Sequence, residues 1–136
     1  MRERLPDTRK SITHKLVLTH HTYFYITVGL YDDGRPAELF ITTNKGNDAI
    51  SGFCKVFGIL VSLALQGGVE FEKLHEKLAF QDFEPKGFTR SADIHSCTSV
   101  VDYVVRWMKF EFGRRELLKE TEKHNGTNNA NTRNSG

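Results

Sequence analysis

The sequence predicts a single α+β domain in which an antiparallel β-sheet of hairpins packs against about three helices. Three observations predict this class. A length of 136 residues suits one domain with its own core. Segments rich in β-branched and aromatic residues come first, and segments with helical apolar spacing follow them. The order of strands and then helices, without an internal repeat, is typical of α+β folds.

A β-hairpin is predicted in the first third of the chain. Tyr23–Tyr31 alternates apolar residues with smaller polar ones, as a half-buried strand does. Asp32–Pro36 follows as a turn, because aspartate starts turns and Gly34 supplies a positive φ. Glu38–Thr42 then returns as the partner strand.

Three helices are predicted after the hairpin. The first, Ala49–Leu65, has apolar residues at spacings of three and four, and Asn47 or Asp48 can cap its start. Because apolar residues occur on both of its faces, we expect it to be buried on most sides. The second helix, an irregular ordered loop and the third helix are expected at residues 70–78, 79–98 and 99–112.

The two ends of the chain are expected to lie outside the globular part. Residues 1–15 are charged and are interpreted as an extended N-terminal arm. Residues 16–116 then form the α+β domain. Residues 117–136 consist largely of Lys, Glu, Asn, Thr and Gly, which cannot bury enough apolar surface to fold alone, so a disordered polar tail is expected there.

Composition excludes several classes of protein. The formal net charge is only +2, which gives no case for wrapping nucleic acid. No run approaches the ~20 apolar residues that span a bilayer, and the charged N-terminus does not resemble a secretory signal, so a cytoplasmic protein without a membrane partner is expected. Cys54 and Cys97 cannot form a four-ligand zinc site, and we expect no bound metal.

The loop before the first predicted helix is a candidate phosphate site. Free N–H groups at a helix start attract anions, Gly46 permits close approach and Lys45 adds charge, and the candidate site includes Asn47 as well. The alternative is an ordinary capped helix start, in which Asp48 would repel an anion.

Arg9, His14 and Lys15 form a second basic cluster, which could hold a phosphate if the arm folds over the hairpin. The alternative is a solvated strand or a strand at an interface. Phe88 and Arg90 are a third candidate, because an aromatic ring can stack on a base while arginine meets a phosphate. The alternative is that the aromatic residues of this loop anchor it to the core.

No catalytic residues are predicted. Cys97 precedes the third helix, whose N-terminus could lower the pKa of the thiol, but His95 is only two residues away and would not share its helix face. No nucleophile with a base, paired carboxylates or triad stands out. We therefore expect no enzyme activity from this chain by itself.

Several blocks, in order, resemble the TSCPD domain found near the C-terminus of adenosylcobalamin-dependent (class II) ribonucleotide reductases. Together they extend from about residue 2 to residue 108, most of the chain. The resemblance also covers Arg9, His14 and Lys15. The main blocks are Arg4–Pro6, Thr27–Tyr31, Asp33–Pro36, Glu38–Thr42, Ile50–Gly52, Phe83–Pro85, Gly87–Thr89 and Ser99–Tyr103.

The resemblance implies a non-catalytic accessory or nucleotide-binding module in deoxyribonucleotide synthesis, with a reductase catalytic subunit as its partner. Adenosylcobalamin is implied only for the full reductase, so no cofactor is expected on this chain alone. The alternative is a phage protein, in the host cytoplasm, that sequesters a cyclic nucleotide immune signal, as anti-defence proteins of the Thoeris type do. Under both hypotheses we expect a homo-oligomer, because a mostly apolar helix and an exposed hairpin favour self-association and nucleotide pockets often lie at such interfaces.

Overall fold

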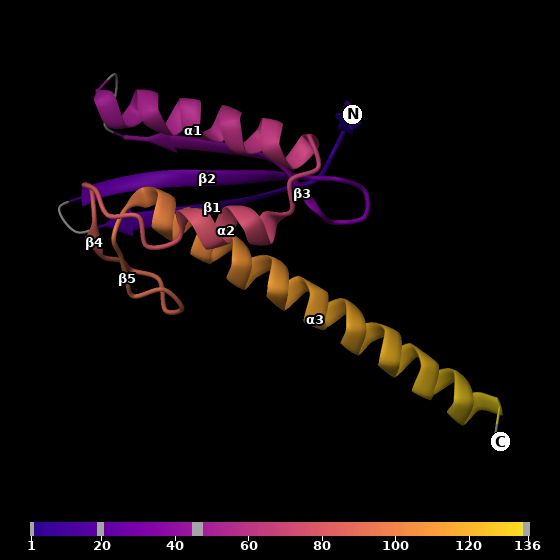
Figure 1. Cartoon of the computed structure of the whole chain (residues 1–136). Helices are drawn as coiled ribbons and strands as arrows, with labels where there is room; N and C mark the ends of the chain where they lie inside the picture. Colours follow the sequence, from indigo (N-terminus) through magenta and orange to yellow (C-terminus); the bar gives the residue numbers. More distant parts are fainter. Residues whose placement is uncertain (1, 19–20, 45–47, 135–136) are drawn as a thin grey trace.

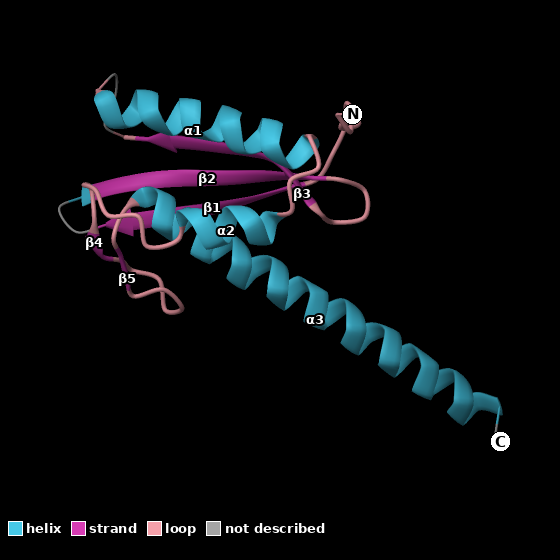
Figure 2. Cartoon of the chain, viewed as in Figure 1, coloured by secondary structure: helices cyan, strands magenta, loops and turns pink. Residues whose placement is uncertain are grey.

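The computed structural model describes residues 2–18, 21–44 and 48–134, with the backbone alone for residues 125–134. It confirms a mixed α+β fold (Figures 1 and 2). A three-stranded antiparallel sheet packs against α2 and α3 with one face, and α1 lies along its β3 edge. The sheet strands are β1 (Ser11–Leu18), β2 (Thr22–Leu30) and β3 (Pro36–Thr43), and their order is β1-β2-β3.

The predicted hairpin is confirmed by β2 and β3. Gly34, in the turn between them, has a φ of 91°, a conformation that favours glycine. The first strand was not predicted, since residues up to 15 were assigned to an extended arm. All eight residues of β1 pair with β2, from Ser11 opposite Gly29 to Leu18 opposite Thr22.

Three helices follow the sheet, as predicted. Asp48 caps the first, because its carboxylate accepts a hydrogen bond from the Ser51 N–H at 3.1 Å. Residues between the second and third helices form an ordered loop with a two-stranded hairpin. The remaining elements are α1 (Ala49–Gln66), α2 (Phe71–Leu78), β4 (Gly87–Phe88), β5 (Ser96–Cys97) and α3 (Val100–Asn134).

The sheet has two unlike faces, because successive side chains of a strand point to opposite sides. The inner face packs against α3 and α2 and is almost fully buried. Within the described residues, no helix lies over the open face. The inner face consists of His14, Leu16, Leu18, Phe24, Ile26, Val28, Leu39 and Ile41. The open face consists of Thr13, Lys15, Tyr23, Tyr25, Thr27, Phe40 and Thr42.

Helix α1 lies close along β3 and covers its free edge. The Ser62 hydroxyl accepts a hydrogen bond from the Leu39 N–H at 2.9 Å and lies 3.3 Å from the Leu39 carbonyl. A Cβ atom built on Gly58 would come within 2.7 Å of that carbonyl oxygen, so only glycine permits this approach. The edge of β3 is thereby protected from pairing with another strand.

The expectation that α1 is buried on most sides was wrong. Cys54, Phe57 and Val61 enter the core, but Val56 and Leu60 on the opposite side are more than half exposed. The expectation that no run approaches the length of a bilayer span was also wrong. Among the described residues, α1 is long and apolar enough to cross a membrane by length and composition alone, with a mean hydropathy of 1.7. Its contacts with β3 make it part of the folded domain.

Helix α3 is much longer than predicted. Its first third packs under the sheet, where Tyr103, Val104 and Met108 are fully buried. The sequence placed its end near Phe112, yet the helix continues to Asn134 and projects away from the domain (Figure 1). The projecting part overlaps residues 117–136, for which a disordered tail was expected, and Lys119 Nζ in it donates a 2.8 Å hydrogen bond to the Asp33 carbonyl.

Candidate functional site

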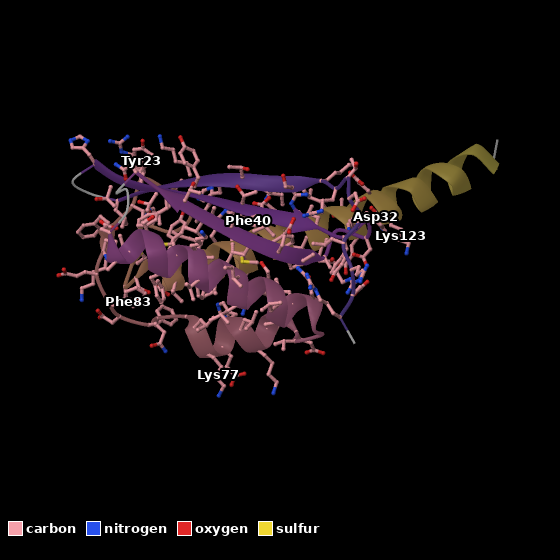
Figure 3. The ribbon with its side chains drawn as sticks, turned by 90° about the horizontal axis from the view of Figure 1, so that it is seen from above. Tyr23, Asp32, Phe40, Lys77, Phe83 and Lys123 are labelled. Atoms are coloured by element: carbon pink, nitrogen blue, oxygen red, sulfur yellow. The ribbon has the colours of Figure 1, made fainter. Side chains whose placement is uncertain are left out.

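A groove of about 830 Å³ runs between α1 and β3 on the side of the open face. Small side chains from α1, those of Ser51 and Ser62, line it together with Gly52. Phe40 forms the wall on β3, and Figure 3 shows this residue on the strand beside α1. Cavities of this volume commonly hold small ligands in proteins.

The open face continues the groove across the sheet. Strand register places Lys15 opposite Tyr25, and Tyr25 opposite Thr42, which lines the groove. Tyr25 and Phe40 expose 41% and 53% of their surface, which is unusual for large aromatic side chains on a sheet. The two rings are therefore available to stack on a flat ligand.

Two cations border this surface. Lys15 Nζ lies 4.6 Å from the centre of the Tyr23 ring and 5.5 Å from that of Tyr25. Lys55 lines the groove on α1, and within the described part of the chain it has no ion pair or hydrogen bond. Both ammonium groups are exposed and can meet an anion next to the aromatic rings.

Arg9, which the sequence suggested as a phosphate ligand, is already paired. Its Nε and one terminal nitrogen donate to the two carboxylate oxygens of Glu38 at 2.6 and 3.0 Å. Glu38 is buried, and the pair raises the pKa of Arg9. This bidentate pair holds the arm on β3 and leaves Arg9 little freedom to bind a phosphate.

His14 lies on the inner face, away from Lys15. Its ring stacks on Trp107 with centroids 4.8 Å apart, and its Nε2 is 2.7 Å from the Tyr103 hydroxyl. Burial lowers the pKa of His14, against the opposing effects of Glu111 and Asp93. A neutral, stacked imidazole is placed to support the core rather than to bind an anion.

Phe88 and Arg90 lie at the end of β1, near Lys15. Thr89 forms an isolated bridge with Leu18, and the Arg90 N–H donates to the Val17 carbonyl at 3.2 Å. Phe88 is among the most exposed aromatic residues of the described chain. These two residues therefore lie on the same side of Lys15 along β1, whereas Arg9 precedes the other end of the strand. At the usual strand rise, Arg9 and Lys15 are about 20 Å apart.

Lys45, Gly46 and Asn47, the proposed phosphate loop, lie outside the described residues. Of their neighbours, Asn44 donates to the His21 carbonyl and accepts from the Tyr23 N–H, each at 3.0 Å, so it ties the end of β3 to the start of β2. Asp48 caps α1. The phosphate role of the loop stays a prediction.

The two cysteines are buried, and burial raises the pKa of each thiol, to about 11 for Cys54. The sequence suggested that the start of α3 could lower the pKa of Cys97, and the opposite direction is found because loss of solvent dominates. Among the described residues, no group of three or more His, Cys, Asp or Glu side chains could hold a metal ion.

The sequence did not single out Tyr25, Phe40 or Lys55. Tyr25 and Phe40 lie in segments that were correctly predicted as strands, and the alternation of β2 already placed Tyr25 and Thr27 on one face. Lys55 is the only charged residue of α1, and this isolated charge in an apolar helix could have marked it as a candidate site residue. Their convergence depends on the docking of α1 beside β3, which local patterns do not encode.

These features define a small α+β domain with an open sheet face and an adjoining helix–strand groove. A family-wide profile for the TSCPD domain matches residues 2–111, and the chain belongs to this family. The match ends within α3, close to the point where this helix leaves the domain. The resemblance read from the sequence blocks is thus confirmed.

Similar proteins named vitamin B12-dependent ribonucleotide reductase occur in several bacteria. The one from Rhodopirellula baltica is 48% identical over 111 residues, which are 82% of this chain and 11% of that protein. The one from Bradyrhizobium diazoefficiens is 40% identical over 115 residues, 84% of this chain and 9% of that protein. The chain thus spans about a tenth of the length of these relatives. No solved structure matches it.

Proposed function

We propose that this chain is a non-catalytic, nucleotide-binding accessory domain in deoxyribonucleotide synthesis. The observation that carries the binding role is the pair of exposed aromatic residues, Tyr25 and Phe40, beside a groove of about 830 Å³. The link with deoxyribonucleotide synthesis comes from the names of its relatives. Reductase chemistry would belong to a separate catalytic subunit, with this domain docked beside it and no cofactor held by this chain.

A nucleotide suits the chemistry of this surface. Aromatic side chains bind bases by stacking, which is worth about 1–3 kcal/mol per base and tolerates any base. Lys15 and Lys55 lie on either side of the aromatic pair and provide positive charge for a phosphate group. The hydroxyls of Thr42, Ser51 and Ser62 supply polar contacts within the same groove.

Self-association is the second part of the proposal, since the groove is open along α1 and a neighbouring copy could close it. The sequestering phage protein is an alternative from the sequence alone, and no feature of the described residues favours a cyclic ligand over a linear one. It therefore stays a prediction.

Nucleotide binding is tested first by mass spectrometry of small molecules released from protein that was purified from a nucleotide-rich lysate. Isothermal titration with nucleoside di- and triphosphates then measures affinity. Phe40→Ala and Tyr25→Ala should each weaken binding roughly 5- to 150-fold, if each ring stacks on a base. Phe110→Ala, which removes an aromatic ring of similar exposure from α3, is the matched control and should bind normally.

Two results would each contradict a different part of the proposal, the location of the site or the binding of a nucleotide. Normal affinity in both Tyr25→Ala and Phe40→Ala would reject this site while leaving nucleotide binding intact. No retained or titrated nucleotide would reject the binding role, and co-purification with a vitamin B12-dependent reductase would then remain as the test of the docking role.

A further inference from the structure

Helix α1 presents a continuous apolar stripe to solvent. Its larger members, Phe53, Val56, Ile59, Leu60 and Leu63, expose between 42% and 60% of their surface, and Ala49 and Gly52 are exposed beside them. All seven fall within about 120° of the helix circumference at 100° per residue. The stripe contains no charged residue, and Lys55 lies at its border. We call these seven residues the α1 stripe.

The α1 stripe is large for the surface of a monomer. With Phe40 beside it, the exposed side chains present on the order of 600 Å², at the upper end of the roughly 300–600 Å² typical of the largest patch on a monomer. A standard interface buries about 800 Å² per partner. The stripe and its surroundings therefore offer most of the area that a stable dimer needs.

The order of side chains along the stripe points to its occupant. If two copies of α1 lie antiparallel and cross at Val56, Ala49 of one copy lies opposite Leu63 of the other. In the same way, Gly52 lies opposite Leu60, and Phe53 opposite Ile59. Small residues at the N-terminal end thus meet large ones from the C-terminal end. A Cβ atom built on Gly52 would meet nothing within 4 Å, so the space over this position at the rim of the groove is open to a leucine from another copy.

We propose that two copies of this chain associate through antiparallel α1 helices, with Val56 of each copy at the two-fold axis. Such an interface is isologous, and the match of the stripe with its own reverse is the property that it requires. An antiparallel pair also sets the positive end of each helix dipole beside the negative end of the other.

This dimer deepens the proposed self-association and rests on it. Gly52, Ile59 and Leu63 belong both to the α1 stripe and to the lining of the groove. A second helix packed on the stripe would therefore add a wall to each groove. Each copy would contribute to the ligand site of the other, as happens in nucleotide pockets between subunits.

A membrane surface suits the stripe less well. Helices that lie on membranes carry several Lys or Arg residues on their polar face, whereas α1 has Lys55 alone. The side of α1 opposite the stripe is also committed to β3 through Gly58 and Ser62. An unrelated protein partner is also less well supported, because binding to it would not need small residues on one side of Val56 to match large residues on the other.

The test introduces opposite charges at the proposed axis. Size-exclusion chromatography with light scattering should give twice the 15.6 kDa chain mass for the wild type. Val56→Glu and Val56→Lys should each be monomeric, with the dissociation constant raised at least roughly tenfold by like charges facing each other. A mixture of the two variants should restore the dimer. Phe88→Glu, which places a charge at an exposed ring outside α1, should remain dimeric.

A second pair of variants tests the antiparallel register. Gly52→Leu should weaken the dimer because its side chain would occupy the space that Leu60 of the other copy needs. Leu60→Ala should weaken it by removing the side chain that packs over Gly52. The double variant G52L/L60A exchanges large for small and should recover affinity. Circular dichroism should show every variant folded, because the substituted positions are exposed.

Each contrary result has one meaning. A wild-type monomer at all concentrations overturns both the dimer and the proposed self-association. A dimer that persists in Val56→Glu keeps self-association but rejects this surface. Failure of the mixed charge variants to pair rejects the two-fold axis at Val56, and binding of a monomeric wild type to phosphatidylcholine–phosphatidylglycerol vesicles assigns the stripe to lipid. Nucleotide titration of monomeric Val56→Glu, done separately, shows whether ligand binding survives.

Discussion

The two faces of the sheet give neighbouring residues opposite roles, and His14 and Lys15 show the contrast most clearly. His14 is stacked on Trp107 on the inner face, whereas Lys15 stands over tyrosine rings on the open face. As two basic residues in sequence, they were grouped in one candidate site. Strand geometry separates them, because adjacent side chains point to opposite sides of a sheet.

This contrast predicts where stability and binding reside. Residues on the inner face, and the layer that covers it, should determine the free energy of unfolding. Residues on the open face should affect ligand binding with little effect on folding. Three substitutions test this division, in order of decreasing effect on stability.

The largest effect is expected from Asp102→Ala, in the helix that covers the inner face. The fully buried Asp102 carboxylate accepts hydrogen bonds from the Phe80 and Thr98 N–H groups at 2.7 and 3.0 Å, and it pairs with Arg106 at 3.1 Å. Removing it leaves these donors without their partner, which should cost about 3–5 kcal/mol in urea unfolding. The exposed Asp93→Ala is the control, and an equal loss there would contradict this account.

An intermediate effect, dependent on pH, is expected from His14. Its pKa is lowered in the folded state by burial, so the unfolded chain takes up the proton first as the pH falls. The free energy of unfolding should therefore be highest above about pH 6.5 and should fall as the pH drops towards the folded-state pKa. His14→Phe keeps a ring beside Trp107 and removes this proton. Unfolding at pH 7.5 and 5.5 should show a smaller decrease for the variant, and equal decreases would contradict the assignment.

The smallest effect on stability is expected from Lys15→Ala on the open face. An exposed cation–π contact is worth about 0.5–1 kcal/mol, and this variant loses the two contacts with Tyr23 and Tyr25. The free energy of unfolding, measured by heat or urea, should change by no more than about 2 kcal/mol, while nucleotide affinity falls because a cation is lost. A large loss of stability would show that the open face, too, supports the fold.

The sequence predicted those elements whose signals are local. The turn around Gly34 and the cap at Asp48 have residues with definite conformational preferences, and both were found in the expected places. β1 was missed because its strand character comes from pairing with β2, and because the charged residues that precede it suggested a solvated arm up to residue 15. The length of α3 was missed because its last turns are polar and lack an apolar periodicity.

The candidate site was less predictable than the fold. Apolar residues around the whole of α1 suggested burial, but composition does not say which side a protein leaves uncovered. Tyr25 and Phe40 come together only through the register of β2 and β3, in which Tyr25 faces Thr42 and Thr27 faces Phe40. Arg9 was predicted as a ligand residue, and its ion pair with Glu38 could not be foreseen because Glu38 is 29 residues away in sequence.

Gly58 has a consequence for the shape of the groove. It lies behind the groove, on the side of α1 that touches the Leu39 carbonyl, where any added side chain would collide with backbone. A larger residue there must push the helix outward from β3, which moves one wall of the groove without altering any group that lines it. The absence of a side chain at position 58 thus sets the width of the groove, and a substitution at this one buried position would change that width without touching the groove lining.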